Sequence, residues 1–222
     1  MLSFSPVIEN IKVNQVVAFM GLIDPFEVAQ LANGLSPYET VLLYRGLGVA
    51  VVPIASGDKR PTRRGWTLRS GELSDFHQGD EIGIMCGQLS QSLVCVDLDG
   101  PLALALADQY LPPTEWIEGR AGKPSAHRFY LAPGVPPEWR STAAGDIGGP
   151  PLLHYSEAKI DFIGTGGHVV GPPSLHPSGE VRRWEAFGQL REISFMELLN
   201  AVNALAVACG DRPKLARTSA GN

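Results

Sequence analysis

The chain has 222 residues, of which 44% are hydrophobic and 18% charged, and this composition excludes a mainly disordered polyelectrolyte and a coiled coil. Its 25 Gly and 18 Pro residues favour short strands joined by turns, so we expect an α+β fold rather than a helical bundle. The formal net charge of -5 excludes a protein that binds duplex DNA through a generally basic surface, so any contact with nucleic acid must be local.

The first part of the chain predicts helices followed by a strand. Residues 1–36 are expected to form an accessory helical segment, which includes a short helix over Pro25–Asn33. Ser36 followed by Pro37 is a signal for the start of the next helix. The β-branched residues at 49–54 then predict a short buried strand.

Short apolar segments bounded by Gly, Pro or Ser predict six further strands, at residues 82–86, 92–97, 126–131, 159–163, 168–171 and 181–184. A helix that starts at Pro101 is expected to separate the second of these strands from the third. A last helix over residues 194–208 carries apolar residues at helical spacing, which indicates that it packs on the core.

The cysteines and the N-terminus bear on the cellular compartment. Cys86, Cys95 and Cys209 include no CxxC pair, so we expect reduced thiols and no structural zinc site. The N-terminus lacks a basic region followed by an apolar stretch, and the chain has no run of about 18 apolar residues. We therefore expect a cytoplasmic protein without a membrane partner.

One segment of this acidic chain is densely basic and contains no acid: it comprises Lys59, Arg60, Arg63, Arg64 and Arg69. One interpretation is a solvated loop, because runs of charge usually face water. The other is a patch that binds phosphates, in which Trp66 is available to stack on a base or to pack.

Two carboxylates, Asp97 and Asp99, follow an apolar strand and are separated by one residue. Along a strand this spacing directs both side chains to one face, where their repulsion favours a compensating cation or proton. Oxygen ligands alone suit Mg²⁺ or Mn²⁺, which substrate phosphates often complete. The alternative is a strand that simply ends in an Asp-Gly-Pro turn.

Two more strands carry residues of interest. Asp161 lies in an apolar strand, where it faces either solvent or the same metal site. Ser125 and His127 are expected on one face of another strand, where the imidazole is either a phosphate ligand or a hydrogen-bonded core residue. The segment Gly166–Gly179 is rich in Gly and Pro, which predicts a rigid turn or a close approach to a ligand.

In this order the motifs resemble the bifunctional primase-polymerase (prim-pol) family of the archaeo-eukaryotic primase superfamily, which is found in replication proteins of plasmids and phages. The resemblance extends from about Tyr44 to Trp184. It comprises an Asp-x-Asp pair, a Ser-x-His pair, an apolar residue followed by Asp, and the Gly- and Pro-rich segment, here Asp97 and Asp99, Ser125 and His127, Ile160 and Asp161, and Gly166–Gly179. The Lys-x-Pro and Gly-Trp pairs in the basic segment are similar to the family as well.

The resemblance implies an archaeo-eukaryotic primase-like α+β fold, in which an αβ unit packs on an RRM-like sheet and the active site lies in the cleft between them. It implies template-directed nucleotidyl transfer, with two Mg²⁺ or Mn²⁺ ions held by Asp97, Asp99 and Asp161. His127 would contact the incoming triphosphate, and Ser125 would assist the phosphates or orient His127.

The implied partners are a single-stranded DNA template, ribo- or deoxynucleoside triphosphates, and a helicase domain or protein, in the cytoplasm of a bacterial host cell. Basic residues expected near the nucleotide are Arg120, Lys123, Arg128, Lys159 and His176, and those expected on DNA are Lys59, Arg60, Arg63 and Arg64. Family members often carry a base two positions after the third-motif Asp. That position is Ile163 here, so Lys159 or another base would have to substitute.

We accordingly divide the chain into an accessory segment (1–36), a catalytic domain (37–192), a helix packed on the core (193–210), and a flexible tail or linker (211–222). Two other functions remain open. A haloacid-dehalogenase-like phosphatase would use Asp97 as nucleophile, although it expects Thr where Pro101 stands. A non-catalytic DNA-binding replication module would keep the fold without the activity.

Overall fold

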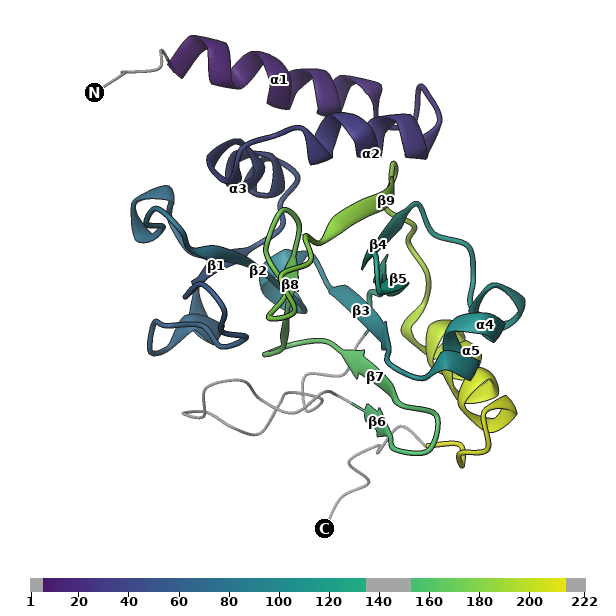
Figure 1. Cartoon of the computed structure of the whole chain (residues 1–222). Coiled ribbons are helices and arrows are strands. Elements are labelled where there is room, and N and C mark those ends of the chain that lie inside the picture. The colour runs from purple at the N-terminus through teal and green to yellow at the C-terminus, as the bar shows by residue number, and fades with distance from the viewer. Residues whose placement is uncertain (1–5, 135–152, 215–222) are drawn as a thin grey trace.

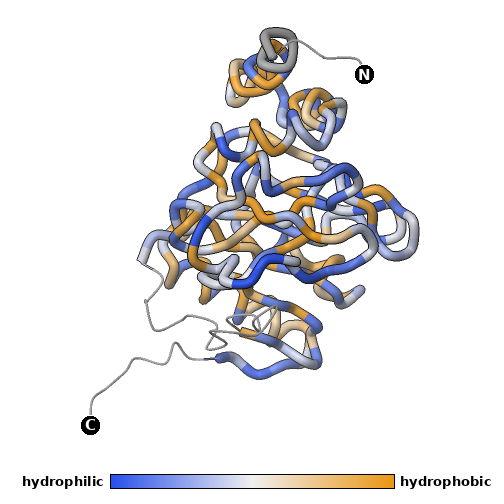
Figure 2. Tube along the Cα trace, turned by 90° about the vertical axis from the view of Figure 1, so that its left-hand side faces the viewer, coloured by the Kyte–Doolittle hydropathy of each residue, from blue (hydrophilic) through white to orange (hydrophobic). Residues whose placement is uncertain are grey.

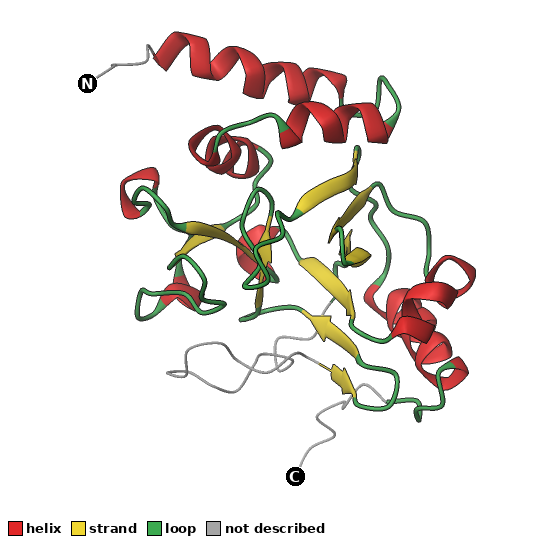
Figure 3. Cartoon of the chain, viewed as in Figure 1, coloured by secondary structure: helices red, strands yellow, loops and turns green. Residues whose placement is uncertain are grey.

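The computed structural model describes residues 6–134 and 153–214 (Figure 1). The helices of this part are α1 (Pro6–Phe19), α2 (Pro25–Asn33), α3 (Pro37–Gly46), α4 (Pro101–Tyr110) and α5 (Phe195–Ala208). The strands are β1 (Val51–Ile54), β2 (Glu81–Met85), β3 (Leu93–Leu98), β4 (Trp116–Arg120), β5 (Lys123–Leu131), β6 (Leu153–Tyr155), β7 (Ile160–Ile163), β8 (His168–Gly171) and β9 (Arg183–Phe187). The expected α+β class is therefore confirmed (Figure 3).

The strands form two antiparallel sheets. The small sheet has the order β1-β2-β8, and the large sheet has the order β6-β7-β3-β5-β4-β9. Figure 1 shows α4 and α5 on one side of the large sheet, the small sheet on the other side, and α1 and α2 beyond β9. Apolar stretches of the chain run through the middle of the molecule (Figure 2).

Strand β3 buries both of its faces in different cores. Val94, Val96 and Leu98 belong to the core that α4 and α5 close, whereas Leu93 and Cys95 belong to a core shared with α2, α3 and the small sheet. Side chains alternate between the faces of a strand, so a continuous apolar run serves both cores. Asp97 lies on the same face of β3 as Leu93 and Cys95, which is the face directed toward the small sheet.

The N-terminal helices cover the edge strand β9. The Asn33 side chain donates to the Trp184 carbonyl (2.8 Å) and accepts from the Trp184 N–H (2.9 Å), which satisfies backbone groups that an open edge would expose. Ser36 caps α3 through a reciprocal capping box with Glu39, as its sequence predicts. The Trp184 indole donates to the Tyr44 hydroxyl (3.0 Å), which ties α3 to the same strand.

Most expected elements are confirmed, with three exceptions. The strand expected at 181–184 is displaced, because β9 covers Arg183–Phe187. The sequence analysis missed β4, which contains Gly119 and two charged residues, and β6, which has only three residues. The accessory segment and the tail extend into residues 1–5 and 215–222, which lie outside the described residues.

Within the described residues, no helix has both the length and the apolar character needed to cross a membrane. Cys86 and Cys95 are buried free thiols, as expected, and burial raises the pKa of the Cys86 thiol to about 12.

Candidate active site

A row of ionisable side chains crosses the large sheet in register. Asp161 on β7 lies opposite Asp97 on β3, Asp97 lies opposite His127 on β5, and His127 lies opposite Glu118 on β4. His154 on β6 continues the row beyond Asp161. Cross-strand partners share a face of the sheet, so the strand register alone gathers these groups on one surface.

Asp97 is compensated by two cations. The Asp97 Oδ1 atom lies 3.4 Å from His127 Nε2 and 3.4 Å from Lys123 Nζ. Burial alone would raise the pKa of Asp97, but His127 and Lys123 outweigh this effect and hold the pKa well below its usual range. The Asp97 carboxylate is therefore charged at neutral pH.

Lys123 also contacts Asp99, so a single ammonium group bridges the two carboxylates that follow β3. The Asp99 side chain is 59% exposed, and its backbone N–H donates to the Lys159 carbonyl (2.8 Å). In this structure Lys123 is therefore the group that compensates the two carboxylates, and the divalent ion that the sequence analysis favours at Asp97 and Asp99 stays a prediction.

Asp161 has a different partner, which the sequence analysis did not identify. Its Oδ1 atom lies 2.6 Å from Nδ1 of His154 on the short edge strand β6. Burial raises the pKa of Asp161 despite this contact. His154 belongs to no motif, and only the pairing of β6 with β7 places it beside the carboxylate.

His127 is held between two carboxylates and is 4% exposed. Its Nδ1 atom contacts Glu118, and its Nε2 atom faces Asp97. Burial alone would lower the pKa of His127, but Glu118 and Asp97 raise it to about 9. The imidazole is therefore cationic at neutral pH, whereas the sequence left its environment open.

A polar cavity of about 90 Å³ lies where these residues meet the loops of the small sheet. Its lining includes Asp97, Asp99 and His127, together with the basic residues Lys59, Arg120, Lys123, His176 and Arg182. All of these except Arg182 were candidates from the sequence. The structure thus brings together residues from the β1–β2 loop, from β3, β4 and β5, and from the β8–β9 loop.

The β8–β9 loop is fixed by the small sheet, which explains how His176 and Arg182 reach the cavity. Ser174 Oγ accepts from the Ile82 N–H (2.9 Å), and Glu81 accepts from the Leu175 N–H (2.7 Å). The Arg182 N–H then donates to the Ser174 carbonyl (2.9 Å). Burial and nearby cations, including Arg120, lower the pKa of His176, so this imidazole is neutral among the basic groups.

Ser125, which was expected to assist the phosphates or to orient His127, is bonded to Glu185 in this structure. Its N–H and hydroxyl donate to the Glu185 carboxylate at 2.8 and 2.6 Å, whereas the groups that contact His127 are Glu118 and Asp97. Ser125 has a φ of 52°, a left-handed conformation within an irregular part of the β4–β5 ladder.

Two of the expected basic residues lie apart from the cavity lining. Lys159 is exposed at the start of β7, where its carbonyl accepts from the Asp99 N–H. Arg128 is directed to α4, where it pairs with Asp108 at 2.6 Å. At the position two residues after Asp161, Ile163 contributes to the core instead.

The basic segment divides into residues with structural contacts and residues that face solvent. Arg63 pairs with Asp75 (2.9 Å) and donates to the Arg69 carbonyl (2.9 Å), so its guanidinium stabilises the loop. Of the two roles that the sequence left open for Trp66, the structure shows packing, because its side chain is buried against Met85 and lies edge-on to His168. Arg60 and Arg64 are exposed, and Lys59 lines the cavity.

The donor set fits a hard divalent cation. Asp97, Asp99 and Asp161 offer the carboxylate oxygens that Mg²⁺ and Mn²⁺ prefer, and the ammonium of Lys123 already occupies a cation position between two of them. Within the described residues no group of three or more His, Cys, Asp or Glu side chains is gathered closely enough to hold a metal ion as it stands. Metal binding would therefore require displacement of Lys123.

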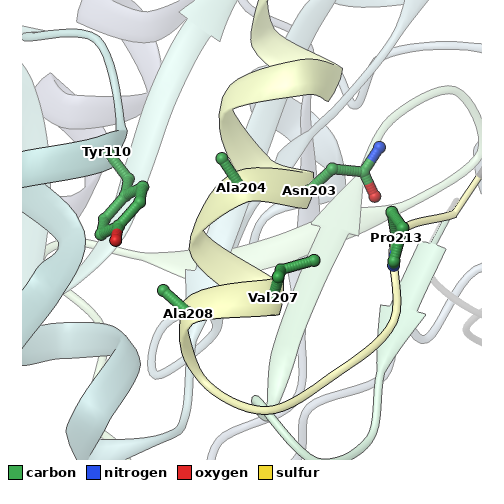
Figure 4. Close-up of a pocket in the computed structure, with 6 residues that line it drawn as sticks. All are labelled: Tyr110, Asn203, Ala204, Val207, Ala208 and Pro213. Atoms are coloured by element: carbon green, nitrogen blue, oxygen red, sulfur yellow. The ribbon is translucent and has the colours of Figure 1, made fainter.

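A larger apolar groove of about 400 Å³ lies on the other side of the large sheet, between α4, α5 and the segment that follows α5 (Figure 4). Its lining is Tyr110, Asn203, Ala204, Val207, Ala208 and Pro213. The Asn203 amide is already bonded to Tyr155 and Lys214, so this groove offers no comparable set of reactive groups.

The raised pKa of His127 predicts a loss of stability at alkaline pH. Folding raises this pKa from 6.5 to about 9, so the charged imidazole contributes fully below pH 6.5 and its contribution is lost as the pH rises through about 9. We expect the stability difference between wild type and His127→Gln, measured by denaturant unfolding in chelator, to shrink between pH 6 and pH 9.5. His77→Gln, which replaces an exposed histidine, is the control for the same comparison. A stability difference between wild type and His127→Gln that does not change with pH would contradict the raised pKa of His127.

Gly119 provides a second test, because an added Cβ there would lie 2.6 Å from the Ser125 nitrogen and 2.9 Å from the Lys123 carbonyl and would also meet Glu185. We expect Gly119→Ala to destabilise the protein by about 1–3 kcal/mol, because the backbone must shift. Gly46 is the matched control, since it is helical and has open space around its Cβ position. Gly46→Ala should be neutral or stabilising by about 0.5–1 kcal/mol. Equal effects in denaturant unfolding would show that the contacts of Gly119 are not restrictive.

Comparison with known proteins identifies the family. The family model Prim-Pol, described as bifunctional DNA primase/polymerase, N-terminal, matches residues 41–194. A search of curated proteins finds no match. The family match covers well over half of the chain and includes both sheets and the entire cavity lining. The chain therefore belongs to the Prim-Pol family of bifunctional DNA primase/polymerase domains.

Proposed function

We propose that this chain is the catalytic domain of a DNA primase/polymerase, which performs template-directed nucleotidyl transfer in the cavity beside Asp97 during plasmid or phage replication. Family membership implies the primase/polymerase type of function. The observation that supports the chemistry is the register of three strands, which aligns Asp161, Asp97 and His127 on one face. Family membership also favours this reaction over the phosphatase alternative.

The carboxylates would hold two divalent ions, Mg²⁺ or Mn²⁺, with Asp97, Asp99 and Asp161 as ligands. When bound, such ions supply charge that activates the attacking 3′-hydroxyl and stabilises the leaving pyrophosphate. The chain itself supplies no obligate side-chain base in this proposal. Its carboxylates position the reactants, and its basic groups neutralise phosphate charge.

Several basic groups are placed to bind a triphosphate. His127 Nε2 faces the cavity from β5, and Arg120, Lys123 and Lys59 line the same space. His176 adds a neutral imidazole from the β8–β9 loop. Because Ser125 is bonded to Glu185, we propose that it acts on nucleotide binding by shaping β5. Lys159 is at most a peripheral contact.

The strand order supports an RRM-like sheet. Within the large sheet the four strands β7-β3-β5-β4 are adjacent, and α4 connects β3 to β4 across one face. We propose that these strands form the RRM-like part, and that α3 with the small sheet forms the αβ unit across the cavity. We retain the proposed division into an accessory segment (1–36), a catalytic domain (37–192), a packing helix (193–210) and a tail (211–222).

The proposal predicts that the carboxylates and His127 fail in different ways. Asp97→Asn, Asp99→Asn and Asp161→Asn should each abolish nucleotide incorporation on a single-stranded DNA template, because each removes a metal ligand. His127→Ala should instead leave measurable incorporation with a raised KM for the nucleotide, because it removes a phosphate contact. The measurement is incorporation of labelled nucleotide with Mg²⁺ or Mn²⁺, with and without primer.

Asp108→Asn, an exposed carboxylate on α4, is the control for that series and should retain full activity. Incorporation that persists in excess chelator, or an active Asp97→Asn enzyme, would refute the proposed site. Phosphate release from simple monoesters without polymer synthesis would instead support the phosphatase alternative. Template binding with intact carboxylates and no incorporation would support a non-catalytic module.

The basic segment predicts a contrast between neighbouring arginines. Arg64→Ala should weaken binding of single-stranded DNA and reduce the slope of log affinity against log salt by about 1, because Arg64 is exposed and available to phosphates. Arg63→Ala should chiefly loosen the loop, because Arg63 already pairs with Asp75. Arg212→Ala, an exposed arginine beyond α5, is the matched control. Wild-type affinity and salt slope in Arg64→Ala would show that the segment is merely solvated.

A further inference from the structure

We propose that Glu118 is a positioning residue: supported by Arg182, it fixes the ring of His127 so that Nε2 faces the cavity. This inference rests on the proposed function, because it assigns a consequence for nucleotide binding to a residue that does not line the cavity. Glu118 matched no motif in the sequence.

The side chain of Glu118 contacts both His127 and Arg182. Its side chain is fully buried, and one of its oxygens contacts His127 Nδ1. Arg182 Nη1 donates to Glu118 Oε1 at 3.0 Å and lies 3.5 Å from Oε2. The side chain of Arg182 is 11% exposed and that of His127 is 5% exposed. The three groups therefore form a largely water-excluded chain from the β8–β9 loop to the cavity.

The backbone around Glu118 is irregular on both sides. The β4–β9 ladder shifts register between Ile117 and Glu118, and the β4–β5 ladder shifts between Glu118 and Arg120. Such bulges redirect side chains and are frequent next to active sites. In the β4–β5 ladder, Glu118 lies directly opposite His127 in the same register as the neighbouring pair Ile117–Arg128, and the ladder becomes irregular only beyond Glu118.

Stability alone is a poor explanation for a buried ionic chain. Transferring a carboxylate out of water is costly, and apolar residues of similar volume often replace buried ion pairs without loss of stability. The neighbours of Glu118 would suit such a replacement, because Trp116, Phe129 and Trp184 pack in the adjoining core. A glutamate here instead fixes the orientation of an imidazole, as carboxylates do beside functional histidines.

The orientation matters because the two nitrogens of His127 have different surroundings. Nδ1 is in contact with the Glu118 carboxylate, and Nε2 faces Asp97 and the cavity. Without that acceptor the ring loses the contact that fixes its rotation about χ2, and the Nε2 group that would meet a phosphate oxygen is no longer held in place.

The first experiment observes the imidazole ring of His127 directly by NMR and does not depend on enzyme activity. In ¹⁵N-histidine-labelled protein without nucleotide, the Nδ1–H group of His127, assigned with His127→Gln, should give a protected, hydrogen-bonded ¹H–¹⁵N signal. Glu118→Gln should shift or broaden this signal, and Glu115→Gln should leave it unchanged. Glu115 is the matched control, because it precedes the same strand and accepts from the Gln189 N–H instead. An unchanged His127 signal in folded Glu118→Gln would overturn the proposal.

The second experiment tests the consequence by calorimetric titration of ATP and dATP with Mg²⁺ and no template. Glu118→Gln should weaken binding about tenfold in the wild-type background, the scale of a hydrogen bond to a charged group. In the His127→Ala background the same substitution should change binding less than twofold, because Glu118 acts through His127. Equal losses in both backgrounds would overturn the proposal.

The outcomes separate this inference from the proposed function. Wild-type protein that binds neither nucleotide would refute the proposed function, while the histidine signal would still decide whether Glu118 fixes the ring. If Glu118→Gln does not fold, Glu118→Asp takes its place in both experiments. It keeps the charge but shortens the side chain by one methylene, so it should likewise shift or broaden the His127 signal.

Discussion

The register of β3 between β7 and β5 is the constraint on which the rest of the structure depends. It places Asp97 opposite both Asp161 and His127, and a slip of one residue would turn Asp97 into the core under α4 and α5. Such a slip would bury an uncompensated carboxylate and bring Val96 to the polar cavity, both at a large free-energy cost. The apolar residues of β3 therefore fix the position of the acids, because each face of the strand has its own core to fill.

Buried charged side chains in this row have neighbours of opposite charge, and His127 pairs with two carboxylates at once. Asp97 lies between His127 and Lys123, and Glu118 lies between His127 and Arg182, so every buried charge has an opposite neighbour. The cavity lining nevertheless carries more basic than acidic side chains, in a chain whose overall charge is -5. A local positive surplus in a confined space favours a polyanion such as a triphosphate, and it does so without a basic protein surface.

Elements and residues whose sequence signals are local could be predicted from the sequence. The capping signals around Ser36 and Pro101 predicted helices that the structure confirms. The spacing of Asp97 and Asp99 indicated two carboxylates that need compensation, and Lys123 contacts both of them. Glu118, Arg182 and His154 could not be found in this way, because their importance arises from strand pairing across long separations in the chain. For Trp66 the sequence left stacking and packing open, because the exposure of an aromatic residue in a basic loop depends on which neighbours, here Met85 and His168, lie beneath it.

The irregular part of β5 explains how Lys123 and His127 both reach Asp97. In a regular strand their Cα atoms would lie about 13 Å apart, at about 3.3 Å per residue. Here β5 uses the residues from Lys123 to His127 to span only Arg120 to Glu118 on β4, so the strand must bend. Ser125 adopts a positive φ within the bend, and Glu185 holds it through two hydrogen bonds. The bend draws the ammonium and the imidazole together on one carboxylate. In the proposed metal-bound state, a divalent ion between Asp97 and Asp99 would displace Lys123 from this bridge. Because Lys123 also lines the cavity, its ammonium would then be available to a triphosphate there, and the proposed binding of metal and of triphosphate would be coupled through Lys123.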